Sequence, residues 1–276
     1  MQAHKSKKSN KIIVYTVLIV FAIVMITPFV WMVLTAFKTI SETIQVDPFV
    51  IFPSQWRLDN FAEVLASIPF LRLYLVTMAM ISGRVISAVV TASLAGYAFA
   101  RIDFFGKKVL FALVLAQLMI PSQIFIIPQF QMVQALGQLN TIFALIFPGL
   151  VTAFGTFLMR QAFMGLPKEL EEAAILDGCN IGQVFWFIMA PLAKSSMIAL
   201  SIFTAIFAYR DLLWPLIVNR TVLSLSPALA QLQGQHTTNF PMLMAAALLA
   251  TLPIIAFYLI FQKQFVEGVA TSGGKL

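Results

Sequence analysis

The sequence predicts an all-α polytopic membrane protein with six transmembrane helices. Of its 276 residues, 60% are hydrophobic and 11% are charged, whereas charged residues make up about 25% of a typical soluble globular protein. The hydrophobic residues gather in six runs, each close to or above the roughly 20 residues that a helical span requires. Because backbone that faces lipid must satisfy its hydrogen bonds within its own segment, we expect negligible sheet content.

The six apolar runs alternate with polar connections along the chain. The first run follows several lysines, as a signal peptide does, but it exceeds an h-region of about 7–15 residues and no clear small-residue cleavage site follows it. We therefore expect an uncleaved first span. The runs cover about 12–37, 73–100, 109–133, 142–159, 196–218 and 240–261. Prolines that can kink a helix by removing a backbone hydrogen bond interrupt them at Pro121, Pro128, Pro148, Pro215 and Pro253.

The distribution of lysine and arginine predicts that both termini are cytoplasmic. Six spans place the termini on one side, and the cytoplasmic side of a membrane protein carries most of the basic residues near span ends. That side holds the N-terminal lysines, Arg101, Lys107, Lys108, Arg160, Lys168, Lys194, Lys263 and Lys275, and the other holds only Lys38, Arg57, Arg72 and Arg220. This orientation accounts for the net charge of +7 without a nucleic-acid partner.

The same topology divides the chain into four parts. We expect a cytoplasmic N-terminus and first span at 1–37, followed by an extracytoplasmic loop at 38–71. A core of five helices follows at 72–265, and a cytoplasmic tail at 266–276 ends the chain.

A polar segment between the fourth and fifth runs begins with a predicted short helix. Pro167 suits the first position of a helix, where its missing N–H is not needed. Glu169, Glu171 and Glu172 follow at the positive end of the helix dipole. Glu169 and Glu171 are interpreted as surface glutamates that stabilise this dipole by about 0.3–1 kcal/mol each.

A sharp turn and a second helix follow. Gly178 can end the first helix in a left-handed conformation, so Asp177-Gly178 forms the predicted bend and a side chain at Gly178 should strain it. Asn180 can cap the second helix, with Gln183 in the capping-box position. The segment that ends at Pro191 therefore predicts a helix–turn–helix on the cytoplasmic side.

This segment and several other motifs resemble those of one family. Glu172-Ala173-Ala174, Gly178, Ile188 and Pro191 have the spacing of the EAA loop of binding-protein-dependent ABC importer permeases. Further motifs of the carbohydrate-importer permeases related to the second membrane subunit of the maltose transporter occur in the same order: Phe37-Lys38, Tyr97-Ala98-Phe99-Ala100-Arg101, Phe104, Gly106-Lys107, Met119-Ile120-Pro121, Pro128, Leu136-Gly137, Asn140-Thr141 and Pro167-Lys168-Glu169-Leu170. The resemblance covers roughly residues 12–276.

The chain also departs from the pattern of this family. Val76-Thr77 stand where the family often has Asn-Ser, and Tyr209-Arg210-Asp211 stand where it often has Trp-Asn-Asp. These departures leave the overall role intact and leave the substrate open.

The resemblance implies a fold, partners and a location. It implies a type I ABC importer transmembrane domain whose EAA loop, at 164–191, carries a coupling helix that docks on a cytoplasmic ATPase. The implied partners are two ATPase subunits, a second related permease, an extracytoplasmic solute-binding protein, a sugar or oligosaccharide as the small-molecule substrate, and the lipid of a bacterial or archaeal inner membrane. The residues implied in ATPase coupling are Glu172, Ala173, Ala174, Asp177 and Gly178.

The sequence offers no catalytic, metal or cofactor site of its own. Gly106-Lys107-Lys108 lacks the upstream glycine and the Ser/Thr of a phosphate-binding loop. The chain has only two histidines and one cysteine, Cys179, so a metal cluster is not expected. We therefore expect a subunit that is not an enzyme and binds no cofactor, with ATP hydrolysis in a separate protein.

Arg84 is an unusual residue for the second apolar run. An arginine at membrane depth costs at least about 2.5–3.5 kcal/mol on insertion scales, so Arg84 should face a cavity or a partner. One hypothesis is that it lines the translocation path and donates hydrogen bonds to substrate or to Asp211. The alternative is a structural ion pair between helices. Arg210 and Asp211, near the outer end of the fifth run, are interpreted as an interfacial pair.

Three alternatives remain open at this point. A phosphorylated polyol such as glycerol 3-phosphate would be a natural partner of Arg84. A stand-alone secondary transporter or channel would need acidic residues at the membrane midplane or an inverted repeat, and a membrane scaffold would not need an EAA loop.

Overall fold

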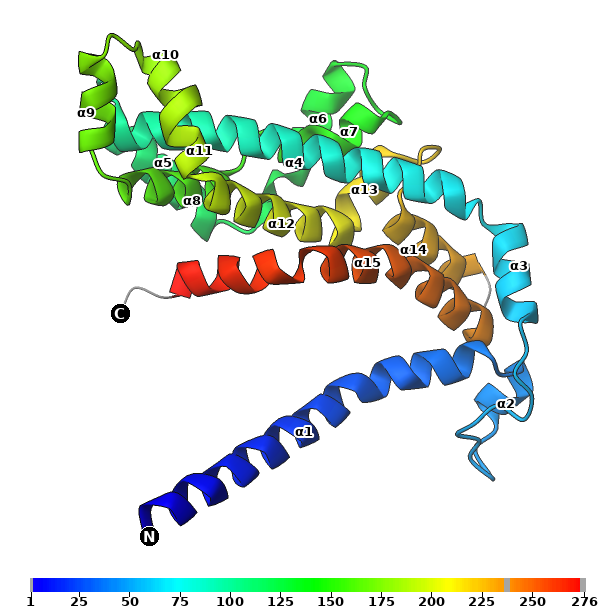
Figure 1. Cartoon of the computed structure of the whole chain (residues 1–276). Helices are drawn as coiled ribbons and strands as arrows, with labels where there is room; N and C mark the ends of the chain where they lie inside the picture. Colours follow the sequence, from blue (N-terminus) through cyan, green and yellow to red (C-terminus); the bar gives the residue numbers. More distant parts are fainter. Residues whose placement is uncertain (1, 236–238, 274–276) are drawn as a thin grey trace. The chain divides into compact units, whose positions relative to one another are not determined.

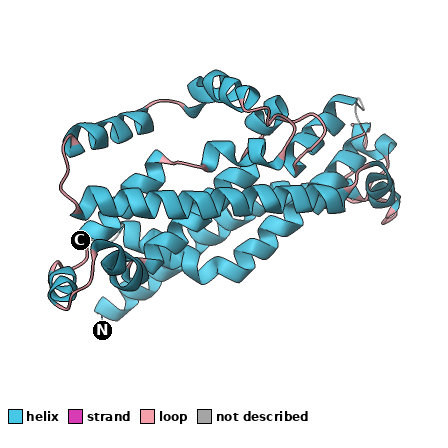
Figure 2. Ribbon diagram, turned by 90° about the horizontal axis from the view of Figure 1, so that it is seen from above, coloured by secondary structure: helices cyan, strands magenta, loops and turns pink. Residues whose placement is uncertain are grey.

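The computed structural model describes residues 2–235 and 239–273, and all regular secondary structure in these ranges is helical (Figures 1 and 2). This confirms the predicted all-α class. The chain divides into two compact units, one formed by Met1–Phe70 with Leu229–Ile255 and the other by Leu71–Ala228 with Ala256–Leu276. Helices α14 (Leu225–Gln235) and α15 (Phe240–Gly273) run from one unit into the other.

Three helices are single apolar segments long enough to cross a membrane. They are Lys11–Ala36, Phe70–Arg101 and Phe240–Lys263. The other three candidate spans in the described ranges are pairs of helices, namely Lys107–Met119 with Ser122–Ala135 bent by 106°, Ile142–Gly149 with Ala153–Met164 bent by 48°, and Ile181–Leu192 with Lys194–Arg210 bent by 74°. The count reaches the six predicted spans when each bent pair is one span.

Local sequence explains where these pairs break. A residue that precedes proline is pushed out of the helical conformation, and Ile120, which precedes Pro121, is extended at φ −91° and ψ 127°. Thr152 is also extended, and its side chain caps the next helix by accepting a hydrogen bond from the N–H of Gly155. The predicted fifth run at 196–218 is not one helix, because the chain is extended at Asp211.

The first unit begins with α1 (Gln2–Ala36), followed by the short helices α2 (Ile40–Ile44) and α3 (Asp59–Ser67). From residue 11 to residue 31, no side chain of α1 is buried against the rest of this unit. Exposed apolar surface on this scale requires lipid or another subunit to cover it.

Lys38 organises the loop that follows α1. Its side chain is buried, its Nζ donates a 2.7 Å hydrogen bond to the carbonyl of Val50, and it lies 4.2 Å from the centroid of the Trp31 ring. Burial lowers the pKa of Lys38. Asn60 of α3 ties the two segments together, because its amide donates to the carbonyls of Ala36 and Lys38.

The second unit is built around the long helix α4 (Phe70–Arg101), which Figure 1 shows beside α8 and α12. Helix α8 also packs against α5. The approach of α4 to α8 is close at Gly96, where an added Cβ would lie 2.7 Å from the backbone nitrogen of Arg160. The remaining elements are α5 (Lys107–Met119), η1 (Ser122–Phe125), α6 (Ile126–Ala135), α7 (Ile142–Ile146), η2 (Phe147–Gly149), α8 (Ala153–Met164), α9 (Glu169–Leu176), α10 (Ile181–Val184), the π-helical turn η3 (Phe185–Met189), α11 (Ala190–Leu192), α12 (Lys194–Arg210) and α13 (Leu213–Val218).

Candidate functional site

Helices α9 and α10 form the predicted helix–turn–helix, at the C-terminal end of α4 (Figure 1). Helix α9 begins at Glu169, so Pro167 lies just before the helix and not at its first position. Gly178 adopts φ +87° between the two helices, as the sequence predicted. The capping box is also confirmed: the N–H of Asn180 donates to Gln183 Oε1 at 2.8 Å, and the N–H of Gln183 donates to Asn180 Oδ1 at 2.9 Å.

The residues singled out in this loop do not all face the same way. Glu172, Ala173, Asp177 and Gly178 are exposed. Ala174 is instead 4% exposed and packs in the core cluster of this unit. Its small side chain therefore lets α9 lie close to the helix bundle. Two apolar side chains on the same helix, Ile175 and Leu176, are also exposed, Leu176 to 89%, and were not among the predicted residues.

Glu171 holds α9 against the end of α4. The hydroxyl of Tyr97 donates a 2.6 Å hydrogen bond to Glu171 Oε1, and Arg101 Nε lies 3.6 Å from Glu171 Oε2. The side chain of Glu171 is 18% exposed. Glu171 is therefore a partly buried contact between helices, whereas the sequence had suggested a surface glutamate that stabilises the helix dipole.

Two further contacts connect this end of α4 to α8. Arg101 donates from Nη2 to two carbonyls, that of Phe163 in the last turn of α8 at 2.7 Å and that of Leu166 just after the helix at 2.5 Å. The ring of Tyr97 packs edge-on against Phe163 at a centroid distance of 5.5 Å and lies 5.2 Å from the ring of Phe185. Hydrogen bonds and ring contacts together join α4, α8 and the loop into one body.

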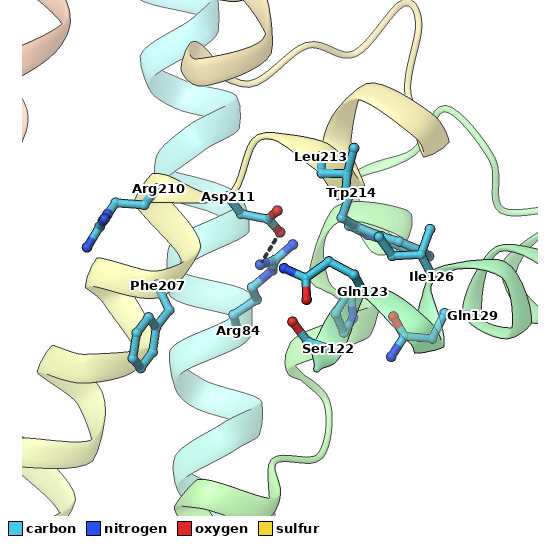
Figure 3. Close-up of a pocket in the computed structure, with 11 residues that line it drawn as sticks. Arg84, Ser122, Gln123, Ile126, Gln129, Phe207, Arg210, Asp211, Leu213 and Trp214 are labelled. Carbon is cyan, nitrogen blue, oxygen red and sulfur yellow. Dashed lines mark hydrogen bonds and ion pairs between the residues drawn. The ribbon is translucent and has the colours of Figure 1, made fainter. Parts of the chain in front are cut away.

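A second polar centre lies further along α4, at Arg84 (Figure 3). Its Nε donates to the carbonyl of Leu145 at 2.7 Å, and its Nη1 forms a 2.8 Å ion pair with Asp211 Oδ2. The side chain of Arg84 is 8% exposed. An added Cβ on Gly149 would lie 2.6 Å from Arg84 Cγ, so glycine leaves the space that the arginine stem occupies.

The ion pair borders a cavity of about 540 Å³ inside this unit, a size typical of small-molecule sites. The lining residues come from α4, η1, α6, η2, α12 and α13: Arg84, Ser122, Gln123, Ile126, Gln129, Pro148, Phe207, Arg210, Asp211, Leu213 and Trp214. The indole N–H of Trp214 donates to the carbonyl of Ala144 at 2.8 Å, so its ring contributes an apolar wall.

The structure changes the interpretation of Arg210 and Asp211. Asp211 pairs with Arg84, a contact proposed from the sequence, and does not form an ion pair with its neighbour Arg210. In Figure 3, the guanidinium of Arg210 points away from the Arg84–Asp211 pair. Ser122, Gln123 and Gln129 also line the pocket and were not predicted as site residues, although three polar residues soon after Pro121 in an apolar run were a visible signal.

The fold and these two centres define a class of protein, a helical membrane permease with an exposed loop at one end and a polar pocket within the bundle. The comparisons agree. Residues 88–271 match the family described as binding-protein-dependent transport system inner membrane component, and the chain belongs to this family. It is therefore a multi-pass permease subunit of an ABC importer.

Curated relatives match nearly the full length of the chain. It is 33% identical, over 98% of its length and 99% of the relative, to the arabinooligosaccharides transport system permease protein of Halalkalibacterium halodurans. It is 31% identical, over 95% of both chains, to the lactose transport system permease protein of Rhizobium radiobacter. It is 29% identical, over 84% of its length and 86% of the relative, to the sn-glycerol-3-phosphate transport system permease protein of Shigella flexneri.

A solved structure has the same fold. It belongs to a bacterial ABC transporter involved in the import of the acidic polysaccharide alginate, and it superposes with a TM-score of 0.77 at 22% identity. The match covers 94% of this chain and 97% of the other.

Proposed function

We propose that this permease forms half of the translocation path of an ATP-driven importer for a sugar or oligosaccharide, and that the loop at 164–191 couples it to a separate ATPase. The observation that carries the proposal is the fixation of an acidic, exposed helix, α9, to the end of α4 through Tyr97 and Glu171. An ATPase that binds this loop and changes conformation would move α4 with the loop.

The exposed side of α9 carries the groups that docking needs. Glu172 presents a carboxylate that can accept charge-assisted hydrogen bonds from an arginine or lysine of the ATPase. Ile175 and Leu176 add exposed apolar surface beside it. The exposed surface also includes Ala173, Asp177 and Gly178. Ala174 is buried, and its small side chain lets α9 pack against the bundle.

Helix α4 connects the coupling loop to the pocket. Tyr97 and Arg84 are 13 positions apart on this helix, which corresponds to about 20 Å along its axis. A displacement of the loop would therefore reach the Arg84–Asp211 pair through a continuous helix. In this proposal, Arg84 and Asp211 line the translocation path.

The substrate class rests on the relatives. Two of those compared are named for arabinooligosaccharides and lactose, and one is named for sn-glycerol 3-phosphate. We favour an uncharged sugar, with the phosphorylated polyol as the second candidate because an arginine lines the pocket. A stand-alone secondary transporter is disfavoured by membership in a family of binding-protein-dependent systems.

The proposed assembly contains two ATPase subunits, a second permease and an extracytoplasmic solute-binding protein. Both termini and the 164–191 loop lie in the cytoplasm, the loop at 38–71 lies outside, and the helices of 72–265 form the core. The exposed apolar surface of α1 fits contact with lipid or with the second permease.

Reconstitution tests the proposal. The permease is purified with its co-encoded subunits and placed in liposomes with the binding protein, and uptake of arabinotriose, lactose and sn-glycerol 3-phosphate is measured with and without ATP. We expect ATP-dependent uptake of a sugar and its loss in Glu172→Ala. Uptake by the permease alone without nucleotide, or labelling of a cysteine placed at Asp177 from the outer face, would contradict it.

A further inference from the structure

The pocket beside the Arg84–Asp211 pair contains hydrogen-bonding groups that the protein itself leaves unused. Arg84 Nη2 is buried and has no hydrogen-bond partner in the described part of the chain. Asp211 uses Oδ2 for the ion pair, and no described residue donates a hydrogen bond to its Oδ1. A buried donor and a nearby acceptor are therefore available side by side.

Neutral polar groups surround this donor and acceptor. Ser122 and Gln123 extend from η1 on the side of the pocket that faces Arg84 (Figure 3), and Gln129 extends from α6. Within the described residues, none of these three side chains forms a hydrogen bond to another side chain or to the backbone. Each hydroxyl or amide can both donate and accept.

The charge of the pocket indicates what it can hold. Asp211 neutralises Arg84, and the guanidinium of Arg210 points away from them (Figure 3). An anionic group that approached Arg84 Nη2 would meet the Asp211 carboxylate as well, at a cost that a neutral group avoids. A solute hydroxyl can accept from Arg84 and donate to Asp211, so the pair matches uncharged solutes with neighbouring hydroxyl groups.

We propose that this pocket is a solute-binding subsite of this subunit, in which Arg84 Nη2 and Asp211 Oδ1 bind adjacent hydroxyls of an uncharged solute while Gln123 and Gln129 set the specificity. This inference rests on the proposed function as an importer. It goes further by assigning direct solute contact to this subunit and by giving a structural reason for the preference for a neutral solute.

The glutamines provide the first test, because they lie outside the ion pair. Gln123→Leu and Gln129→Leu remove polar groups from the pocket, and Gln131→Leu, two positions further on α6 and outside the pocket lining, is the matched control. In liposomes with ATP and saturating binding protein, we expect the lactose or arabinotriose moved per ATP hydrolysed to fall about tenfold in the double pocket variant, as for the loss of two ligand hydrogen bonds. The control should keep the ratio of the unsubstituted protein.

Asp211→Asn provides the second test. It keeps the shape and an acceptor for Arg84 but leaves the positive charge of Arg84 without its neutralising partner. We expect the concentration of sn-glycerol 3-phosphate that half-inhibits sugar uptake to fall about tenfold in this variant. A half-inhibiting concentration equal to that of the parent protein would overturn the charge argument.

The outcomes separate this inference from the function on which it rests. If the unsubstituted complex moves none of the three probes with ATP, the proposed function itself fails. If it transports sugar and the pocket variants keep the same ratio as Gln131→Leu, only the subsite is wrong. Loss of the second permease from the purified double variant would show that the pocket is a contact between subunits, which also overturns the subsite.

Discussion

The hydroxyl of Tyr97 donates a 2.6 Å hydrogen bond to Glu171, and this bond joins the main helix of the bundle to the short helix of the EAA loop. Arg101, one turn further along α4, brings a positive charge to the same carboxylate and holds the end of α8. Because these groups are largely buried, the contact persists under conditions in which an exposed ion pair would be screened. The loop is thereby attached to the bundle by its own acidic side chain.

Removal of the Tyr97–Glu171 bond should weaken coupling. We expect Tyr97→Phe, which keeps the ring and removes the hydroxyl, and Glu171→Gln to lower the sugar transported per ATP hydrolysed, because a hydrogen bond to a charged group contributes about 1.5–3 kcal/mol. Copurification of the ATPase should persist, since Glu172 and Leu176 stay exposed. The measurement is parallel uptake and phosphate release in proteoliposomes.

Glu169 supplies the control for this prediction. It lies in the first turn of the same helix and is exposed. Glu169→Gln should leave the transport ratio at the parent value. Equal losses in Glu169→Gln and Glu171→Gln would show that the helix dipole, and not the contact with Tyr97, is responsible.

Substitution of Gly178 should destabilise the turn, because the backbone conformation at this position is unfavourable for most other residues. Its φ of +87° lies in the left-handed region, and an added Cβ would meet no atom within 4 Å, so crowding plays no part. We expect Gly178→Val to destabilise the turn by at least about 1–2 kcal/mol and to reduce ATPase copurification, with Gly178→Asn milder because asparagine tolerates this conformation. Gly165→Ala, where the backbone is helical at φ −78°, should copurify normally. Normal copurification of Gly178→Val would contradict this account of the bend.

The sequence predicted the bend well and the surroundings of the loop poorly. Gly178 and the Asn180–Gln183 box act through residues close in sequence, so their types and spacing specify the result. The partner of Glu171, Tyr97, lies 74 positions earlier in the chain, and no periodicity of the loop carries that information. The Arg84–Asp211 contact is different: the cost of an arginine at membrane depth predicts a partner, and Asp211, one of the partners proposed from the sequence, pairs with Arg84 although the two are 127 positions apart.

Some breaks in the apolar runs are likewise marked by the local sequence, and others are not. Pro121 identifies one break, because proline acts on the residue before it. The end of α12 at Arg210 has no proline or glycine directly after it to mark it, and hydrophobicity continues to Val218. The chain is extended at Asp211, which pairs with Arg84, and local propensity did not predict that the helix would end there.

Glu42 should make the loop after α1 sensitive to acid. Hydrogen bonds from Ser54 and Thr39 lower the pKa of Glu42 to about 2. A carboxyl whose pKa is lower in the folded state than its ordinary value of 4.5 contributes stability above pH 4.5 and loses it as the pH falls toward 2. Between those values the parent protein should lose thermal stability in detergent, and Glu42→Gln should lose less over the same interval. Parallel losses in the two proteins would show that another group is responsible.

The Arg84–Asp211 pair should be more costly to break than to replace. Removal of one partner of a buried ion pair leaves an uncompensated charge and costs about 3–5 kcal/mol, whereas replacement of both partners by apolar residues is often close to neutral. We therefore expect Arg84→Met and Asp211→Leu each to lower the thermal unfolding temperature of the purified complex strongly, and the double variant to recover much of the loss. Uptake should stay low in the double variant even though its stability recovers, because the proposed hydroxyl contacts are gone. A double-mutant cycle measured on both unfolding temperature and uptake separates the structural role of the pair from its role in transport. If the double variant transports sugar at the parent rate, the pair serves only to hold α4 to the chain after α12.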